Sequence, residues 1–489
     1  MGQRHVAPRL GRGFSEHLQR PLGQGHLPVG GCTGAAGGAA CGDVVRVSLA
    51  VDPHSPRGVI ADAGFDATGC GAMTAAGSAA VALLQGAPLL SASRIDADAI
   101  ATELGGLSPG KRHAAELAAD ALHRALGGAA REHARLQSDD DRVLVAMSGG
   151  VDSAVAALLL AREGRGAVAV TLELWSDPAN DGESSCCSAQ AVRGARALAH
   201  GLGMPHLSID LREEFRTGVV DPWLQGHRGG LTPNPCVRCN GSVRLDAMLA
   251  LGERLGARAL ATGHYARLHS GPLLRVAAEE RRDQSYVLAA LAPESLARMR
   301  FPLGQMSKRE VRALAAEAGL AVASRRDSQD LCFLAGTRQD AFLARHGSLV
   351  ERPGPVVDAR GRRLGEHRGA HLYTVGQRRG LGIGGGAPLY VLGTDAHANT
   401  VTAGDREQLL TRRLPVRDVV LHRGAGCVNG VRLRAHGRTH SCRVDSDLKA
   451  GSYARADVEL ARPVERTAPG QLACLYADEL VVGYGTVVA

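Results

Sequence analysis

Residues 142–160 read RVLVAMSGGVDSAVAALLL, and this stretch decides the fold. It opens with an apolar run of strand length, turns at residues 148–150, and continues from Ala154 in an Ala/Leu-rich helical pattern. A strand, a glycine turn and a helix N-terminus bring backbone N–H groups and the positive end of the helix dipole to one point. Gly149 and Gly150 let a phosphate approach the backbone because they carry no Cβ. The stretch therefore predicts an anion site at the end of a strand.

The hexapeptide at residues 148–153, SGGVDS, is not a Walker A loop, because no Gly-Lys-Ser/Thr follows its glycines. It resembles the PP-loop of the ATP pyrophosphatases, enzymes that split ATP between the α- and β-phosphates and adenylate an oxygen. An ordinary strand–helix turn is the alternative. The resemblance implies that ATP is bound by Ala146, Met147, Ser148, Gly149, Gly150, Val151, Asp152 and Ser153.

Size and composition limit the possible classes of protein. The 489 residues suffice for three or four domains of about 150 residues each. The formal charge of +8 fits a polyanionic partner, although an arginine-rich composition produces the same excess. No run of 18 apolar residues and no secretory signal is present, so we expect no membrane partner and a cytoplasmic location. In that compartment, the 11 unevenly spaced cysteines favour metal binding or catalysis over a disulfide framework.

The first 130 residues predict an α+β domain. Its expected strands cover residues 44–51 and 58–65, and its expected helices cover residues 15–20, 72–84, 96–104 and 111–126. Four side chains in or beside the loops of this segment are possible ligands of zinc or of an iron–sulfur cluster. They are Cys41, Asp43, Cys70 and His113.

These four residues lie in the motifs CGD at 41–43, GCG at 69–71 and KRH at 111–113. With them, the segment resembles the IscU/NifU N-terminal family of iron–sulfur scaffold proteins along nearly its whole length. That family carries a cysteine directly after the histidine, as a ligand and sulfur acceptor, where this chain has Ala114. Two hypotheses follow: the remaining four groups still bind a metal, or the domain is a degenerate scaffold that docks a sulfur donor.

After a polar linker at residues 131–141, the segment 142–347 predicts an α/β domain with a doubly wound parallel sheet. Apolar strands alternate with helices, and such a sheet binds its ligands at the carboxyl ends of the strands. The expected strands are residues 143–146, 167–174, 206–210 and 259–262, and the helices after the first are residues 189–202 and 242–255.

Four further motifs accompany the loop in a fixed order. They are TPNPCVRCN at 232–240, ATGHYAR at 261–267, DQSY at 283–286 and DSQDLCF at 327–333. Together with SGGVDS they resemble the tRNA-specific 2-thiouridylase family (MnmA), from about Arg142 to the C-terminus. The chemistry agrees, because ATP can turn the poor leaving oxygen of a uridine into AMP, and a cysteine persulfide can supply the sulfur.

The resemblance implies a role for each matching residue. Cys332 would carry the persulfide and Cys239 would be the nucleophile, while Leu172 and Gly263 would hold the adenosine and Mg²⁺ would accompany the ATP. The partners implied are the anticodon stem-loop of tRNA, with its wobble uridine flipped out, and a cysteine desulfurase or other sulfur-relay donor. The implied tRNA contacts are Asn234, Pro235, Cys236, His264, Arg282, Asp283, Gln284, Arg434 and Gln471.

Cys236 departs from the family, whose best-known members have an acidic residue there. With Cys239 and Cys332 it makes three thiols, which suggests a [4Fe–4S] cluster that delivers hydrosulfide as the alternative to a persulfide relay. Two further alternatives are a PP-loop ligase that adenylates a small carboxylate or amide, and a non-enzymatic iron–sulfur carrier. Exchange of pyrophosphate into ATP, measured with and without tRNA, separates the thiouridylase, the small-molecule ligase and the non-enzymatic carrier.

The last third of the chain predicts β structure. Residues 348–408 are expected to form a small β domain that contacts tRNA, and residues 409–489 an antiparallel barrel of six short strands. The expected strands cover residues 417–421, 430–435, 440–444, 454–460, 471–476 and 479–488. Four arginines of the barrel are possible phosphate contacts or simply solvated side chains: Arg432, Arg434, Arg438 and Arg443.

Overall fold

The computed structural model describes residues 13–37, 42–177, 188–325, 331–383 and 387–488. The chain divides into two compact units. Unit 1 comprises residues up to Glu173 together with 189–210 and 248–261, and unit 2 comprises residues 174–188, 211–247 and 262–489. Among the described residues, no helix has both the length and the apolar composition needed to cross a bilayer.

The front part of unit 1 is an α+β domain, as predicted. An antiparallel sheet in the order β1-β2-β3 packs against helices. Its elements are α1 (Gly13–Gln19), β1 (Cys32–Gly37), β2 (Val44–Val51), β3 (Ile60–Thr68), α2 (Gly71–Leu84), α3 (Leu89–Ala92), α4 (Ala97–Glu103) and α5 (Arg112–Glu132). The sequence analysis missed β1 and α3, ended β3 three residues too early and ended α5 six residues too early.

The second part of unit 1 is the predicted parallel sheet. Strands β4, β5, β6 and β7 pair in parallel in the order β7-β4-β5-β6, and β5 is buried along its whole length, as expected for a strand covered on both faces. The elements are β4 (Asp139–Ala146), α6 (Val151–Arg162), β5 (Ala167–Glu173), α7 (Ala189–Gly201), β6 (His206–Asp210), α11 (Leu245–Arg254) and β7 (Ala257–Ala261).

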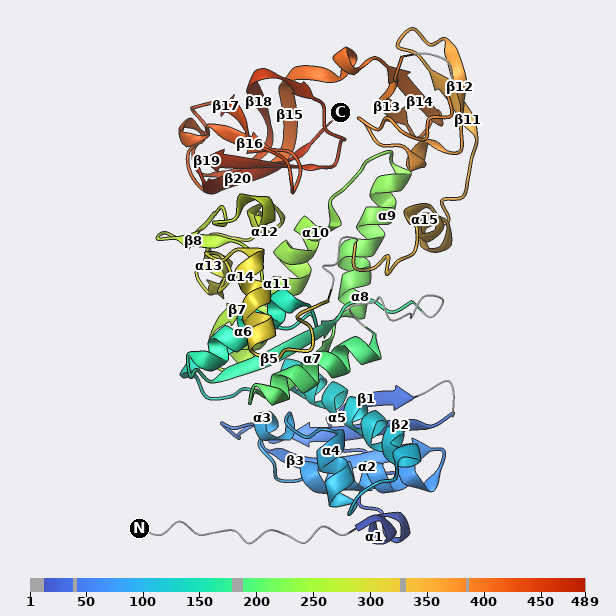
Figure 1. Ribbon diagram of the computed structural model, residues 1–489, viewed down its shortest axis with the longest axis vertical. Coiled ribbons are helices and arrows are strands. Elements are labelled where there is room, and N and C mark those ends of the chain that lie inside the picture. The colour runs from blue at the N-terminus through green and yellow to red at the C-terminus, as the bar shows by residue number, and fades with distance from the viewer. Residues whose placement is uncertain (1–12, 38–41, 178–187, 326–330, 384–386, 489) are drawn as a thin grey trace. The chain divides into compact units, whose positions relative to one another are not determined.

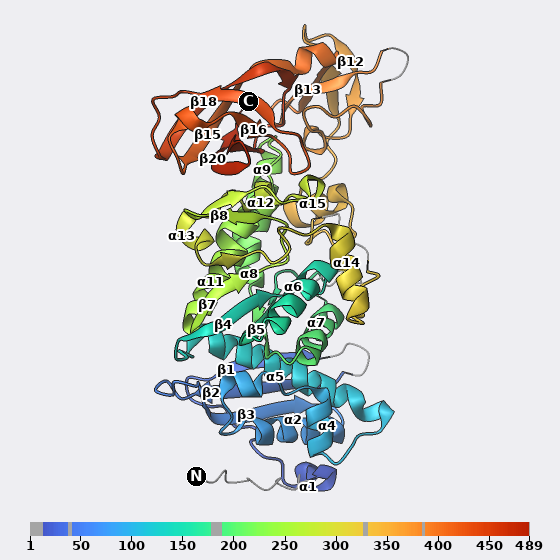
Figure 2. The same cartoon turned by 60° about the vertical axis from the view of Figure 1, so that its left-hand side comes forward.

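The two parts of unit 1 are joined closely. Between α5 and β4 lie only residues 133–138, fewer than the predicted linker, and the N–H of Leu136 donates to Arg254 O at 2.8 Å. Figures 1 and 2 show α5 between the two sheets. It covers the outer edge of β6, where His123 Nδ1 contacts His206 O at 3.2 Å and Arg131 donates to Asp210 O at 2.9 Å. An edge strand covered in this way cannot pair with other chains.

Two buried histidines at this junction, His123 and His206, are expected to make unit 1 less stable in acid. Burial, and after it the charge of Arg196, holds the pKa values of His123 and His206 well below the usual value. As the pH falls below about 6.5, the unfolded chain takes up protons that the folded chain refuses, so the free energy of unfolding decreases. We expect the melting temperature to drop by several degrees between pH 7 and pH 5, and His206→Gln to reduce that drop. The exposed His54→Gln is the control, and an equal drop in both variants would contradict the assignment.

Unit 2 begins with short helices and ends in β structure. Its first elements are α8 (Arg212–Phe215), α9 (Asp221–Arg228), α10 (Pro235–Arg238), a π-helical turn (Cys239–Arg244), β8 (Arg267–His269), β9 (Leu273–Arg275), α12 (Ser285–Leu288), α13 (Pro293–Leu296), β10 (Met299–Arg300), α14 (Lys308–Glu317) and α15 (Gln339–Gly347). A small sheet in the order β12-β11-β14-β13 follows, as expected. It contains β11 (Gly354–Val357), β12 (Arg363–His367), β13 (Tyr390–Asp395) and β14 (Thr400–Gly404).

The C-terminal part is the predicted antiparallel barrel of six strands. They follow one another as β15-β18-β17-β16-β19-β20, and pairing of β15 with β20 closes the barrel. The strands are β15 (Leu410–Leu421), β16 (Gly430–Arg432), β17 (His440–Val444), β18 (Gly451–Glu465), β19 (Leu472–Ala477) and β20 (Leu480–Val487). Their inward side chains, among them Val416, Val458 and Leu475, form one apolar core.

Candidate functional site

The glycine turn after β4 is held by its two serines. Ser153 Oγ accepts hydrogen bonds from the N–H and the hydroxyl of Ser148, at 3.1 and 3.2 Å, and donates to Gly150 O at 3.0 Å. Gly149 has a φ of 71°, a conformation that glycine adopts without strain. Helix α6 begins directly after the turn, so its N-terminal N–H groups and dipole are available to an anion.

The other predicted ATP contacts surround this turn within unit 1. Ala146, Met147 and Val151 are buried and fix the loop on the core, whereas Ser148 is exposed and Asp152 is half-buried. Strand β5 lies beside β4, with Met147 N–H donating to Val170 O at 2.8 Å. Leu172, two residues further along, is therefore at the carboxyl end of the sheet, where such folds bind ligands.

Three of the four predicted metal ligands meet at one point of the front domain. Asp43 precedes β2, Cys70 directly precedes α2 at its N-cap position, and His113 lies in the first turn of α5. His113 Nε2 is 3.0 Å from Asp43 Oδ2, and the Cys70 thiol is 3.4 Å from the same oxygen. The hydrogen bond from His113 lowers the pKa of Asp43. Cys41, the fourth predicted ligand, is outside the described residues.

The backbone around this cluster leaves no room for substitution at Gly69. Its φ is 134°, and a Cβ there would lie 2.0 Å from Asp43 Oδ1. Ala114, which follows His113, is fully buried and offers no ligand atom. The donor set of one carboxylate, one thiol and one imidazole suits zinc better than an iron–sulfur cluster, which is usually held by several thiolates.

Cys236 and Cys239 lie on α10 and on the π-helical turn that continues it. The Asn234 side chain caps α10 by accepting from Cys236 N–H at 3.1 Å. Cys239 is 8% exposed, and burial raises the pKa of Cys236. Because residues three apart on a helix share a face, the two thiols lie on the same side of this segment.

Cys332 is exposed, whereas the next residue is anchored in an aromatic cluster. The Phe333 ring packs against Trp223 and Phe342, each with ring centroids 5.2 Å apart, and Phe215 and Trp175 complete the cluster. Both tryptophans and three of the six phenylalanines of the chain are thus gathered here. The sequence analysis missed this cluster, although the scarcity of aromatic residues could have drawn attention to it.

Cys236, Cys239 and Cys332 do not belong to a metal site among the described residues. The sets of three ligand atoms that lie within 4.8 Å of one another are Cys32 with Glu132 and His133, and Asp43 with Cys70 and His113. Neither set includes Cys236, Cys239 or Cys332, so the geometry does not favour the [4Fe–4S] alternative. Cys186 and Cys187 fall outside the described residues.

The predicted tRNA contacts differ widely in accessibility. His264 is buried beside Thr262 Oγ1, and burial lowers its pKa to about 3, so it is neutral at physiological pH. Gln284 accepts from Tyr265 N–H at 2.9 Å, and Gln471 donates to Thr232 O at 2.6 Å. Gly263, a predicted adenosine contact in unit 2, is half-buried.

Asp283 and Arg432 form a buried ion pair. Asp283 also accepts from Ser285 Oγ at 2.6 Å and from Ala277 N–H at 2.9 Å, and Arg432 lies over the Tyr476 ring. The suggestion that Arg432 contacts phosphate is wrong, because its side chain is only 10% exposed and is paired with Asp283. Of the triplet 282–284, only Arg282 and Gln284 reach the surface, each half-buried.

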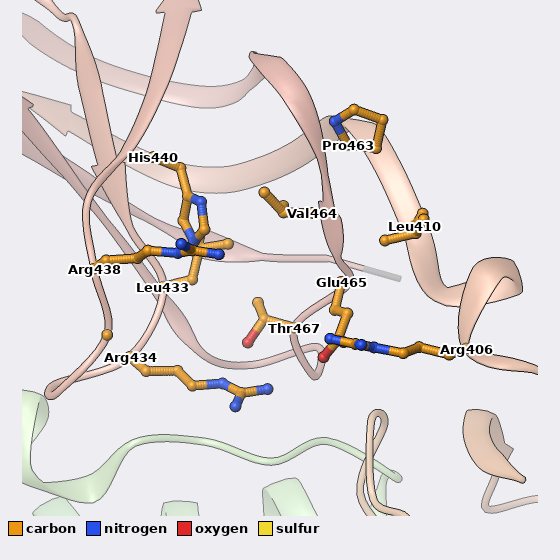
Figure 3. A pocket seen from close by; sticks show the side chains of 11 residues that line it. Arg406, Leu410, Leu433, Arg434, Arg438, His440, Pro463, Val464, Glu465 and Thr467 are labelled. Atoms are coloured by element: carbon orange, nitrogen blue, oxygen red, sulfur yellow. The ribbon is translucent and has the colours of Figure 1, made fainter. Parts of the chain in front are cut away.

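A pocket of about 350 Å³ opens on the barrel beside Arg434. Figure 3 shows Arg434, Arg438 and His440 on one side of it and Arg406, held by Glu465, on the other. Arg434 and Arg438 are exposed, and no described carboxylate lies within ion-pair distance of either. Burial and the charge of Arg438 lower the pKa of His440. The pocket therefore presents two positive charges to an anion.

Models of known protein families match four successive segments of the chain, which correspond to the front domain, the ATP domain, the small β domain and the barrel. Residues 13–133 match the NifU-like N-terminal domain, and residues 141–336 match the HUP domain called tRNA methyl transferase. Residues 340–405 match the associated PRC-barrel domain, and residues 414–487 match the aminomethyltransferase β-barrel domain.

Whole proteins with the same arrangement exist. The chain is 41% identical over 497 residues to the bifunctional protein NifU/MnmA of Rubrobacter xylanophilus, with 98% of each chain covered. It is 43% identical to the tRNA-specific 2-thiouridylase MnmA of Methylorubrum extorquens, over 71% of this chain and 94% of that protein. The tRNA-specific 2-thiouridylase MnmA of Sorangium cellulosum is 40% identical, over 75% of this chain and 97% of that protein. The chain therefore belongs to the family of bifunctional NifU/MnmA proteins, in which a NifU-like domain is fused to the domains of the tRNA-specific 2-thiouridylases.

Proposed function

We propose that the protein replaces O2 of the wobble uridine of tRNA by sulfur, at the expense of ATP. The observation that carries this proposal is the serine-closed glycine turn at the start of α6, in a chain that also places Cys239 and Cys332 in the family motifs. The relatives named 2-thiouridylases support the choice of substrate. Neither a small-molecule ligase nor a non-enzymatic carrier requires both the loop and the two thiols.

The reaction divides into activation and sulfur transfer. The uridine O2 attacks the α-phosphorus of ATP, pyrophosphate leaves, and C2 then carries an adenylated oxygen. The Cys239 thiolate attacks the Cys332 sulfur of the persulfide, forming a disulfide and releasing hydrosulfide. Hydrosulfide attacks C2 and AMP leaves with the original oxygen. A thiol reductant restores both cysteines, and the donor desulfurase reloads Cys332.

The residues of the chain have separate tasks in this scheme. The turn at 148–153 and the N-terminus of α6 would hold the phosphates, and a bound Mg²⁺ would neutralise charge on the departing pyrophosphate. The base must leave the stack to expose O2, and Asn234, Pro235 and Cys236 would lie beside it. Since burial raises the pKa of Cys236, this thiol is protonated at neutral pH and is a poor nucleophile.

The exchange of labelled pyrophosphate into ATP tests this proposal. We expect exchange that depends on a tRNA bearing uridine at the wobble position and that disappears when this base is cytidine. Exchange that is equally fast without tRNA would point to a small-molecule substrate. Absence of exchange with every substrate would point to a non-enzymatic carrier.

The arginines of the barrel pocket are proposed to contact tRNA phosphates. The double change Arg434→Gln with Arg438→Gln should raise the KM for tRNA about tenfold, with kcat unchanged, because it removes charge without touching the reacting atoms. The slope of log affinity against log salt should flatten by about 0.7–0.9 for each lost phosphate contact. Arg413→Gln, which removes an ion pair with Asp457 in the same barrel, is the control. An unchanged salt slope would exclude the pocket from the tRNA interface.

The front domain is proposed to bind zinc at Asp43, Cys70 and His113 and to dock the sulfur donor. The three donors fit a metal that accepts mixed oxygen, sulfur and nitrogen ligands. Cys70→Ser should reduce the zinc content from about one ion per chain to near zero, whereas Cys427→Ser in the barrel should leave it unchanged. Metal analysis of the purified chain gives the answer. The visible absorption of an iron–sulfur cluster in the unaltered protein would contradict the zinc assignment.

A further inference from the structure

A bidentate ion pair connects the front domain to the end of β5. Arg124 of α5 donates from Nε and Nη2 to the two carboxylate oxygens of Glu173, at 3.1 and 3.0 Å. The Glu173 side chain is only 5% exposed, and that of Arg124 is 28% exposed. The third nitrogen, Nη1, donates to Ala35 O of β1 at 2.7 Å. One guanidinium thus joins β1 and α5 of the front domain to a strand of the ATP domain.

Glu173 occupies a sensitive position, because it is the last residue of β5 and directly follows Leu172. Strands β4 and β5 are paired in parallel up to Ala146 and Val170, after which β4 turns into the glycine loop. Glu173 is three residues beyond that pair, about 10 Å along the strand. A buried carboxylate at this end of the sheet would repel the phosphates of ATP if no cation neutralised it.

The front domain holds Arg124 in place by contacts on either side of it along α5. One turn before it, Asp120 accepts from the buried Arg196 of α7 at 2.7 Å. One turn after it, Gly127 approaches β6 so closely that a Cβ would lie 1.8 Å from Ser208 O. The helix therefore cannot shift along the sheet without losing these contacts. The Arg124 guanidinium is thus kept at the end of β5, beside Glu173.

We propose that Arg124 is a positioning residue of the nucleotide site. Because Arg124 lies on α5, the fused front domain then contributes to that site. This inference rests on the proposed binding of ATP at the glycine turn and at Leu172. Arg124 cancels the charge of Glu173 and fixes the end of β5, so that the backbone of Leu172 is held for the adenosine. A lysine could supply the charge but not the planar, two-pronged contact.

The test measures ATP binding at equilibrium, and the KM for ATP and kcat in tRNA-dependent exchange, with the full-length chain. Arg124→Gln should weaken ATP binding and raise the KM about tenfold, the loss expected for one charge-assisted contact, with kcat within about twofold. The KM for ATP of Arg124→Lys should lie between that of the unaltered protein and that of Arg124→Gln. The double change Arg124→Gln with Glu173→Gln should recover most of the loss, because it removes the carboxylate that needs neutralising.

Arg193→Gln is the matched control, since it breaks ion pairs with Glu116 and Asp120 at the same junction, whereas Arg196 keeps its own ion pair with Asp120 and so still holds α5 in place. We expect it to lower the melting temperature without changing the KM for ATP. An unchanged KM in Arg124→Gln, an equal rise in Arg193→Gln, or no recovery in the double variant would overturn the inference. If the unaltered protein binds ATP but shows no tRNA-dependent exchange, the proposed function fails, while the binding constants still decide the role of Arg124. Should Arg124→Gln not fold, Arg124→Lys carries the same comparison.

Discussion

Replacing Cys332 by alanine should abolish 2-thiouridine in tRNA while leaving tRNA-dependent ATP–pyrophosphate exchange nearly intact. The thiol at this position is exposed and belongs to the sulfur-transfer half of the reaction, whereas exchange reports only adenylation. Loss of a group that forms the covalent intermediate should reduce thiolation by about 10³-fold or more. Mass spectrometry of nucleosides from tRNA incubated with the variant measures the product.

Two further cysteine variants accompany Cys332→Ala, one as a control and one to test the attacking thiol. Cys427→Ala removes another exposed thiol, on the barrel, and should leave thiolation unchanged. Cys239→Ala should also stop thiolation, but with the persulfide accumulating on Cys332, because the attacking thiol is missing. Substantial 2-thiouridine from the Cys332 variant would end the persulfide-relay scheme, and loss of exchange in that variant would assign Cys332 to activation as well.

Gly149→Ala should be the most damaging single change in the ATP domain. At a φ of 71° an added Cβ introduces backbone strain, and it also occupies the space through which a phosphate approaches the turn. We expect kcat/KM for ATP to fall by about 10²-fold or more, comparable to the loss of one preorganised donor to a developing charge. The exchange assay measures this value at varied ATP concentration.

A second glycine separates strain from phosphate binding. Gly164, in the turn after α6, has a φ of 70°, and no atom lies within 4 Å of the position of its Cβ. Gly164→Ala therefore introduces the same backbone strain far from the loop, and it should lower the melting temperature with little effect on kcat/KM. Equal losses of activity in the two variants would mean that the turn acts through stability alone.

The missed strand β1 illustrates a limit of prediction from sequence. Cys32–Gly37 contains glycine and alanine in place of the β-branched residues that favour strands, so no local preference indicates one. Its pairing with β2 and its contact with α5 create the strand. A Cβ on Gly34 would lie 2.1 Å from Ala121 O, so the close approach of the helix requires glycine there. A residue that weakens the local signal is thus required by the tertiary packing.

The arginines of the barrel show the same limit at the level of function. Arg432 and Arg434 are two residues apart on a segment that reads as alternating, so the local pattern makes both possible phosphate contacts, and only Arg434 is also among the predicted tRNA contacts. The fold buries the first against Asp283, 149 residues away in sequence, and exposes the second in a pocket. Only the packing of the barrel against the segment that carries Asp283 decides which charge can meet a ligand.

The features that depend on short-range order could be predicted from the amino-acid sequence. These are the glycine turn between β4 and α6, the alternation of strands and helices around it, and the six short strands of the barrel, because steric preference and hydrophobic periodicity act within a few residues. The family resemblance, and no local pattern, predicted that Asp43, Cys70 and His113 converge. Which other distant charges meet depends on the tertiary structure. The pairing of Arg124 with Glu173 and the burial of Arg432 against Asp283 each join segments tens of residues apart, and no local pattern encodes such contacts. Their formation depends on the packing of whole elements, which excludes water and thereby forces each buried charge to find its partner.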